Sequence, residues 1–201
     1  MTQKLLCRVA HPDTSYEIEI AHGVLSCPAE LKGFLIAKDY RCVIIADAFV
    51  GALYGEKLEK LLSCFQIPVT LLTFPPGEEK KTRETKTFLE DKMLEKGFGR
   101  DTCVIALGGG VVTDIAGYIA ATYCRGVPLI MIPTTLLGMV DASIGGKVGV
   151  NASSYKNMIG CIYQPKRVVI DPTVLASLPW KEIANGLVEM IKHGEIGRAH
   201  V

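Results

Sequence analysis

Short apolar runs that recur along the chain constrain its fold more than any other feature. Six of them have the composition of strands: Tyr16–Ile20, Cys42–Ala46, Val69–Phe74, Thr102–Leu107, Pro128–Ile132 and Arg167–Ile170. Segments with helical spacing of apolar residues separate most of these runs, among them Phe49–Phe65, Arg83–Lys96 and Val111–Thr122. Strands that alternate with helices predict an α/β domain with a mainly parallel sheet.

The pattern changes after Asp171. The segment Ser177–Gly194, SLPWKEIANGLVEMIKHG, begins a helix that no strand follows. We therefore expect an α/β domain over residues 1–175 and, over residues 176–201, the first helix of an all-α domain that the chain does not complete.

Composition excludes several classes of protein. About half of the 201 residues are apolar, which is enough for a sizeable core, and the net charge of +1 gives no electrostatic reason for binding nucleic acid or an anionic membrane. The N-terminus lacks the apolar core of a signal peptide, and no apolar run approaches the roughly 20 residues of a membrane span. We expect a soluble, cytoplasmic protein.

The seven cysteines form no CxxC pair, and several lie in apolar, strand-like contexts. At this chain length the pattern indicates buried free thiols in a reducing compartment rather than a disulfide framework.

The most distinctive motif is LGGGVVTD (Leu107–Asp114), in which an apolar strand leads through three glycines into a helix. Glycines permit positive φ and let the backbone approach a ligand, and a helix N-terminus attracts phosphate. The motif predicts a pyrophosphate site, with a tight structural turn as the alternative. Asp114 falls in the predicted first helical turn, where it could simply favour the helix dipole.

Two further strand ends carry polar residues. PPGEEKKT (Pro75–Thr82) offers Glu78 and Lys81 to a ribose or a phosphate, although a solvated turn that opens the next helix would look similar. Asp47 ends another strand, at the sheet edge where open α/β sheets bind their ligands.

The segment Pro133–Asn151, PTTLLGMVDASIGGKVGVN, interleaves hydroxyls, an acid, a lysine and glycines with apolar residues, and Lys156 and Asn157 follow it. A solvated loop does not need this mixture, so we interpret the segment as part of a ligand site. In the last helix, Glu182, Asn185, Glu189 and Lys192 share one face, which is either a functional surface or an ordinary solvated one. The histidines form neither HxH nor HxxxH.

Taken in order, GGGVVTDIAGYIAATYCRG, PTTLLGMVDASIGGKVGVN, KNMIG and SLPWKEIANGLVEMIKHG resemble 3-dehydroquinate synthase, in the sugar-phosphate cyclase superfamily. The resemblance runs from about Asp47 to Gly194. It implies a Rossmann-like α/β domain and an NAD- and zinc-dependent (or cobalt-dependent) lyase of the shikimate pathway. That lyase converts 3-deoxy-D-arabino-heptulosonate 7-phosphate to 3-dehydroquinate and phosphate by transient oxidation, phosphate elimination, re-reduction and an intramolecular aldol closure.

The resemblance also implies roles for individual residues. The implied NAD contacts on the pyrophosphate side are Gly109, Gly110, Val111, Val112, Thr113 and Asp114. The further implied cofactor contacts are Asp47, Glu78, Lys81, Thr134, Thr135, Lys147, Lys156 and Ser177. The implied substrate and catalytic residues are Asp141, Lys147, Asn157, Lys192 and Arg125. Arg125 would reach the substrate phosphate of a neighbouring subunit, which implies a homodimer, and Glu189 would be the one zinc ligand from this half.

The chain departs from the family after Gly194. The implied second half, with two histidine ligands, is missing, and residues 195–201, EIGRAHV, read like a translated sequencing adapter and are expected to be non-native. We expect the chain as written to be inactive as a synthase, since a catalytic zinc needs roughly three protein ligands. The alternatives are another sugar-phosphate cyclase making an inosose or a valiolone, a glycerol-dehydrogenase-like enzyme, a non-catalytic NAD-binding module, or a fragment that only dimerises.

Overall fold

The computed structural model describes residues 14–27, 29–153 and 155–198, and its centre is a parallel sheet of six strands. The strands are β1 (Glu17–Ile20), β2 (Arg41–Asp47), β3 (Val69–Phe74), β4 (Thr102–Gly108), β5 (Leu129–Pro133) and β8 (Arg167–Ile170). Their order is β1-β8-β5-β4-β2-β3. All six predicted strands are confirmed, with ends that agree to within one residue, as is the parallel α/β class.

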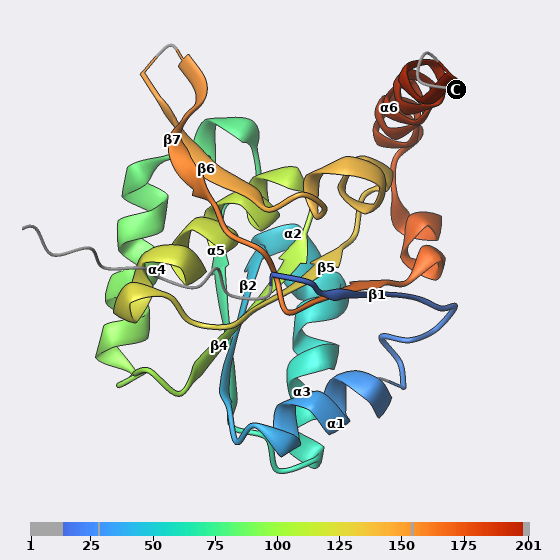
Figure 1. Cartoon of the computed structure of the whole chain (residues 1–201). Coiled ribbons are helices and arrows are strands. Elements are labelled where there is room, and N and C mark those ends of the chain that lie inside the picture. Colours follow the sequence, from blue (N-terminus) through green and yellow to red (C-terminus); the bar gives the residue numbers. More distant parts are fainter. Residues whose placement is uncertain (1–13, 28, 154, 199–201) are drawn as a thin grey trace, which may run out of the picture.

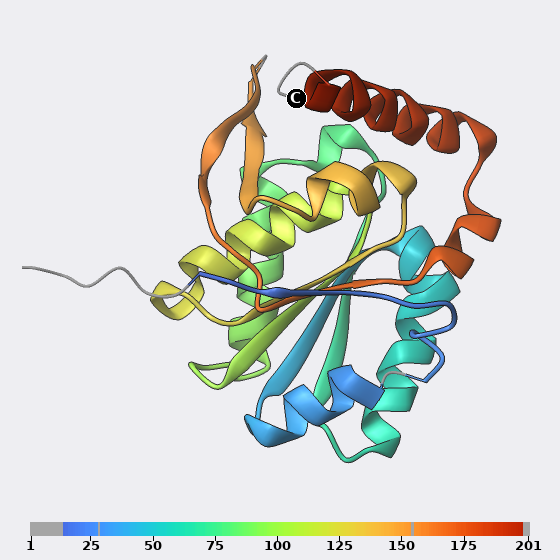
Figure 2. The ribbon, with the colours of Figure 1, turned by 45° about the vertical axis from the view of Figure 1, so that its right-hand side comes forward.

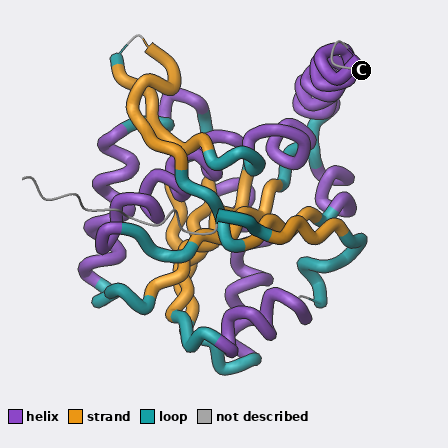
Figure 3. The backbone as a smooth tube through the Cα atoms, viewed as in Figure 1, coloured by secondary structure: helices purple, strands orange, loops and turns teal. Residues whose placement is uncertain are grey.

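Helices cover both faces of this sheet, with the strands at the centre (Figures 1 and 3). The helices of the domain are α1 (Ala29–Ala37), α2 (Ala48–Val50), α3 (Glu56–Cys64), α4 (Arg83–Glu95) and α5 (Gly110–Thr122), and the π-helical turn η1 (Gly51–Gly55) joins α2 to α3. On one face α4 and α5 pack through residues such as Met93 and Ile115, and on the other α1 and α3 pack through Leu35 and Leu62. Each face has its own apolar core, as expected for a doubly covered parallel sheet.

One helix and one two-stranded hairpin were not predicted from the sequence. Helix α1 has Gly33 in its interior, and this residue weakens the helical pattern. Strands β6 (Lys147–Ala152) and β7 (Tyr155–Ile162) form a separate antiparallel hairpin, where Gly149 lies opposite Gly160. A Cβ atom at Gly160 would overlap the backbone carbonyl of Val148, so this crossing needs glycine.

The hairpin lies over helix α5 and projects from the domain (Figure 2). Val148 and Val150 are buried in the same core as α5, and a Cβ atom at Gly117 of α5 would overlap the Val148 side chain. The absence of a side chain at Gly117 thus allows close packing, and the polar residues at the end of the hairpin come to lie above the sheet edge.

Helix α6 (Trp180–Arg198) follows the 3₁₀ segment η5 (Pro172–Ser177), and it contacts the domain through the π-helical turn η4 (Gly138–Ala142). Several of its large apolar side chains are exposed, including Trp180, Val188 and Ile191. The predicted last helix is confirmed in position. Residues 195–198 of the expected non-native tail continue it, whereas residues 199–201 lie outside the described residues.

The structure bears on two expectations from the sequence, which concern membrane-spanning helices and the cysteines. None of the helices in the described part of the chain combines the length and apolar character of a membrane span. The six described cysteines are free, but only Cys42 and Cys103 are fully buried, whereas Cys27, Cys64 and Cys161 are exposed. The expectation of burial therefore holds for Cys42 on β2 and Cys103 on β4, and it is wrong for those three, of which Cys161 lies on β7. Cys7 lies outside the described residues.

Candidate functional site

The glycine motif joins β4 to α5 at the carboxyl edge of the sheet. Strand β4 ends at Gly108, Gly109 precedes the helix, and α5 begins at Gly110. The first N–H groups of the helix, at Gly110, Val111 and Val112, have no acceptors within the helix and form a site suited to an anion.

The physical reason for the glycines differs from the prediction. None of the three has a positive φ. Space is short at two of them: a Cβ atom would lie 2.5 Å from Cγ2 of Val112 at Gly108 and 2.9 Å from Cγ2 of Thr135 at Gly109. The motif therefore brings bare backbone to the sheet edge, where a ligand can approach it closely.

Asp114 lies in a buried polar cluster and not in the first helical turn, where it would interact with the helix dipole. It is the fifth residue of α5, so its predicted place in the first turn is wrong. The Lys81 ammonium, on a side chain that is 5% exposed, contacts both the Asp114 carboxylate and the side-chain oxygen of Asn157. Burial raises the pKa of the Asp114 carboxyl, and Lys81 opposes this effect without cancelling it.

A second set of hydrogen bonds ties the hairpin to the loop after β3. The Asn151 amide donates to Glu78 Oε1 at 2.9 Å, and its oxygen accepts from the Asn157 N–H at 2.9 Å. The backbone N–H of Asn151 donates to the Lys81 carbonyl at 2.8 Å, and Lys156 Nζ lies 3.9 Å from Glu78 Oε1. Asn151 was not assigned a role from the sequence, although it ends the KVGVN motif. Here it fixes the position of the predicted site residues around it.

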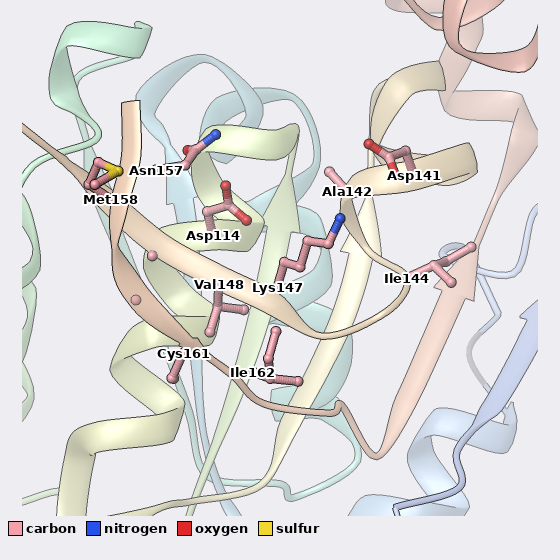
Figure 4. Close-up of a pocket in the computed structure, with 12 residues that line it drawn as sticks. Asp114, Asp141, Ala142, Ile144, Lys147, Val148, Asn157, Met158, Cys161 and Ile162 are labelled. Carbon is pink, nitrogen blue, oxygen red and sulfur yellow. The ribbon is translucent and has the colours of Figure 1, made fainter. Parts of the chain in front are cut away.

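The predicted substrate residues surround a common space. A cavity of about 490 Å³ is lined by Asp114, Asp141, Lys147 and Asn157, together with apolar residues of the hairpin. In Figure 4 these four side chains come from α5, η4, β6 and β7 and face the same space. One cation, two acids and an amide therefore converge beside the glycine motif, where they can form hydrogen bonds to a polar ligand.

Other predicted cofactor residues lie at the same sheet edge. Asp47 ends β2, and its Oδ1 accepts hydrogen bonds from the N–H groups at the start of α2. Thr134 and Thr135 follow β5, where Thr135 caps the next turn through Gly138 N–H at 3.0 Å. Asp47 and Thr135 thus have local structural roles, and all three residues stand at the carboxyl ends of parallel strands, where ligands of such sheets bind.

Two further predicted residues do not line the cavity. Ser177 is on η5, and its hydroxyl is 2.7 Å from that of Tyr54, a residue that the sequence did not single out. Arg125 is exposed at the far end of α5, about 20 Å from its first turn at 1.5 Å per residue. The structure therefore does not bring Arg125 to the cavity within one chain, and its role in a neighbouring subunit stays a prediction.

Metal-ligating side chains gather where α6 meets η4. Donor atoms of Asp141, Glu189 and His193 all lie within 4.8 Å of one another. The Lys192 ammonium contacts Glu189 Oε1, and this hydrogen bond raises the pKa of Lys192. Two carboxylates and one imidazole are a donor set that suits Zn²⁺ or Co²⁺. Only Glu189 was assigned as a ligand from the sequence; its spacing of four residues from His193 was the available signal for the second donor.

Two similar curated proteins carry the same name, 3-dehydroquinate synthase. The chain is 46% identical over 184 residues to a 3-dehydroquinate synthase of Vibrio atlanticus, covering 92% of this chain and 50% of that protein. It is 45% identical over 166 residues to a 3-dehydroquinate synthase of Chlamydia caviae, covering 83% and 44%. The chain thus spans about half the length of these relatives.

Solved structures show the same fold. A 2-epi-5-epi-valiolone synthase from Streptomyces hygroscopicus with NAD⁺ and Zn²⁺ bound is 37% identical, with a TM-score of 0.82 over 93% of this chain and 51% of that one. A 2-deoxy-scyllo-inosose synthase complexed with carbaglucose-6-phosphate, NAD⁺ and Co²⁺ is 29% identical, with a TM-score of 0.81 over 89% and 48%. A probable glycerol dehydrogenase from Sinorhizobium meliloti, 17% identical with a TM-score of 0.61 over 83% and 42%, shows likeness of fold alone.

A family model gives the assignment. Residues 62–185 match the model described as 3-dehydroquinate synthase N-terminal, and this range covers more than half of the chain and includes the glycine motif, the hairpin and the start of α6. The chain therefore belongs to the 3-dehydroquinate synthase family.

Proposed function

We propose that this chain supplies the NAD-binding half of a 3-dehydroquinate synthase, with one side of its substrate and metal site. The whole enzyme would convert 3-deoxy-D-arabino-heptulosonate 7-phosphate to 3-dehydroquinate and phosphate. The observation that carries the proposal is the Asp114–Lys81–Asn157 cluster. It connects the glycine motif, which suits a dinucleotide, to the cavity that suits a phosphorylated substrate.

The residues at the sheet edge would bind the cofactor. The N–H groups of the first turn of α5 would hold the pyrophosphate, because they are unpaired within the helix and lie at its positive end. Asp47 and Glu78 are acids beside the same edge, where they would accept hydrogen bonds from ribose hydroxyls. The remaining predicted contacts in this role are Lys81, Thr134, Thr135, Lys147, Lys156 and Ser177.

The cavity residues would orient the substrate. Lys147 in the cavity and Lys192 on the neighbouring α6 would offer ammonium groups to its carboxylate and phosphate. Asp141 and Asn157 would offer hydrogen-bond acceptors and a donor to its hydroxyls. When bound, NAD⁺ accepts and returns a hydride, and a metal held by Glu189 polarises the hydroxyl that is oxidised. By holding Asn157, Lys81 would fix one side of the cavity while the cofactor occupies the other.

The proposal also covers the contact between subunits and the activity of this chain alone. Arg125 is exposed at the end of α5, and it would reach the substrate phosphate of a second subunit in a homodimer. We expect the chain alone to bind NAD⁺ but to release phosphate from the substrate no faster than a blank, because it spans about half the length of its relatives.

Calorimetric titration with NAD⁺ tests the cofactor site directly. We expect the chain to bind NAD⁺ and the Gly109→Val variant to bind at least about tenfold more weakly, since one well-placed interaction of 1.4 kcal/mol corresponds to that factor. Gly33→Ala is the matched control, because a Cβ atom there meets nothing within 4 Å. Equal affinity in Gly109→Val and the unaltered chain would exclude the glycine motif as the pyrophosphate site.

Another sugar-phosphate cyclase is the second candidate, favoured by the 37% identity to a valiolone synthase structure. The 3-dehydroquinate synthase relatives are closer in sequence, at 45% and 46%. Titration of the NAD⁺-loaded chain separates the two. Binding of the heptulosonate phosphate, but not of a sugar phosphate without the carboxylate, supports the synthase; the reverse preference supports the alternative.

A further inference from the structure

We infer that Asn151 is a positioning residue that couples the cofactor side of the site to the substrate cavity. Its side-chain amide lies between Glu78, which we assign to a ribose of NAD⁺, and Asn157, which lines the cavity (Figure 4). A dinucleotide bound at Glu78 would therefore help to hold Asn157 in place before the substrate arrives. The inference deepens the proposed function and rests on it for the role of Glu78.

Both ends of the Asn151 amide are in use. Its Nδ2 donates to Glu78 Oε1 at 2.9 Å, and its Oδ1 accepts from the backbone N–H of Asn157 at 2.9 Å. A side-chain amide carries a donor and an acceptor on one planar group, whereas a carboxylate has acceptors only. An aspartate at position 151 could therefore keep the bond to Asn157, but it would lose the bond to Glu78 and repel that carboxylate.

The backbone fixes the point from which this amide acts. The register of β6 against β7 shifts between Val150 and Ala152, so Asn151 stands at an irregularity of the hairpin. Its backbone N–H donates to the Lys81 carbonyl at 2.8 Å, in the loop after β3 that also carries Glu78. Asn151 is thus tied to this loop through its main chain and its side chain.

Asn157 needs such support because of its backbone conformation. Its φ is +57°, in the left-handed region that residues other than glycine seldom adopt, although asparagine is among those found there most often. The bond from its N–H to Asn151 restrains the backbone, and the contact of its side-chain oxygen with the Lys81 ammonium restrains the side chain. Loss of Asn151 would remove the first restraint, so the amide at the cavity would gain freedom.

Glu78 is the member of this arrangement that a cofactor can order. Its side chain is 46% exposed, and Lys156 Nζ lies 3.9 Å from the same Oε1 that accepts from Asn151. Ribose hydroxyls that donate to this carboxylate would restrict Glu78 and, through the amide, Asn151 and Asn157. A ligand in the cavity would then find part of the ordering already done, which makes the binding of the two ligands cooperative.

Exchange of the Asn157 N–H with solvent, measured by nuclear magnetic resonance on the ¹⁵N-labelled chain, tests the coupling. The probe is ADP-ribose, which has the pyrophosphate and both riboses of NAD⁺ but lacks the nicotinamide ring that could cover Asn157 directly. We expect saturating ADP-ribose to slow this exchange about fivefold or more in the unaltered chain, the lower end of typical couplings between sites.

Two variants of Asn151 separate the coupling from simple support of the hairpin. Asn151→Leu removes both hydrogen bonds, so exchange at Asn157 should be fast with or without ADP-ribose. Asn151→Asp keeps the acceptor for the Asn157 N–H, so exchange should be slow without ligand, but ADP-ribose should not slow it further. Asn185→Leu is the matched control, because exposed Asn185 also donates to a glutamate, Glu182 Oε2, at 3.3 Å. It should respond to ADP-ribose as the unaltered chain does.

The outcomes separate this inference from the proposed function. If calorimetry shows that ADP-ribose binds but exchange at Asn157 does not slow, the coupling is refuted while the cofactor site stands. The coupling is also refuted if Asn151→Asp responds to ADP-ribose as fully as the unaltered chain. If neither ADP-ribose nor NAD⁺ binds, the proposed function fails and the coupling fails with it. Should Asn151→Leu lose the resonances of the folded hairpin, Asn151→Asp still decides, because it keeps the bond that supports Asn157.

Discussion

Replacing Lys81 with methionine should destabilise the domain strongly, and by an amount that depends on pH. The substitution keeps the length and the burial of the side chain but removes the cation from Asp114 and the donor from Asn157. Breaking a buried ion pair by removing one partner costs about 3–5 kcal/mol. We expect a loss near 3 kcal/mol at pH 8, the lower end of that range, because 19% of the Asp114 side chain is exposed.

The pH dependence follows from the Asp114 carboxyl. Burial already raises its pKa above the unfolded value, and the loss of Lys81 would raise it further, since that ammonium lowers it. A carboxyl with a raised pKa in the folded state favours folding at low pH, and this advantage is lost as pH rises through the folded pKa. The cost of Lys81→Met should therefore shrink as the solution is acidified from pH 8 towards the unfolded pKa of about 4.

Urea unfolding followed by circular dichroism at several pH values measures this cost. Lys92→Met is the matched control, because it removes the cation of the exposed Lys92–Glu95 pair and should cost at most about 1 kcal/mol. Adding Asp114→Asn to Lys81→Met should recover part of the lost stability and remove the pH dependence. A cost that is the same at every pH, or no larger than that of the control, would refute the reasoning.

Three further predictions concern stability. Asp171→Asn should cost at least about 2 kcal/mol, because its buried carboxylate accepts hydrogen bonds from three backbone N–H groups and a hydroxyl. Burial opposes these bonds, but together they lower the pKa of Asp171. The stability that the carboxylate contributes is therefore present above the unfolded pKa and is lost on acidification. When Tm is measured at decreasing pH, the variant should show a smaller drop than the unaltered chain. Gly160→Ala should cost about 1–3 kcal/mol in urea unfolding, since the new methyl group overlaps the Val148 carbonyl, and an unchanged midpoint would contradict the hairpin geometry. Tyr54→Phe should cost about 1 kcal/mol by losing the hydrogen bonds of the hydroxyl to Ser177 and to the Val174 carbonyl, and a thermal melt that matches the unaltered chain would show that these bonds contribute nothing.

The strands and most helices could be predicted because local composition decides them. Strands β2 and β4 are buried on both faces and therefore appear in the sequence as continuous apolar runs. The β6–β7 hairpin could not be predicted in the same way. Its paired glycines break the alternation of side chains, and seven of the eight residues of β7 are exposed, so no buried pattern marks that strand.

The polar residues of the site also combine features that the sequence predicts with contacts that it does not predict. The family resemblance assigned Lys81 and Asp114 to the cofactor site and Asn157 to the substrate pocket, but their mutual contacts depend on how the hairpin crosses α5. His193 was overlooked because its partner Asp141 lies on a distant segment, which only the packing of α6 against η4 brings near.

By itself, the sequence determined the α/β class, the six strands, the glycine motif after β4 and membership of the 3-dehydroquinate synthase family. These features depend on local patterns and on the order of motifs, both of which can be recognised in the sequence alone. Only the tertiary structure decided that Lys81 is buried between Asp114 and Asn157, that the glycines serve close packing rather than positive φ, and that Asp141 and His193 join Glu189. The physical reason is that such contacts join residues far apart in the chain. Their distances depend on packing at Gly117, Gly160 and Gly186, where the absence of a side chain lets two segments approach closely.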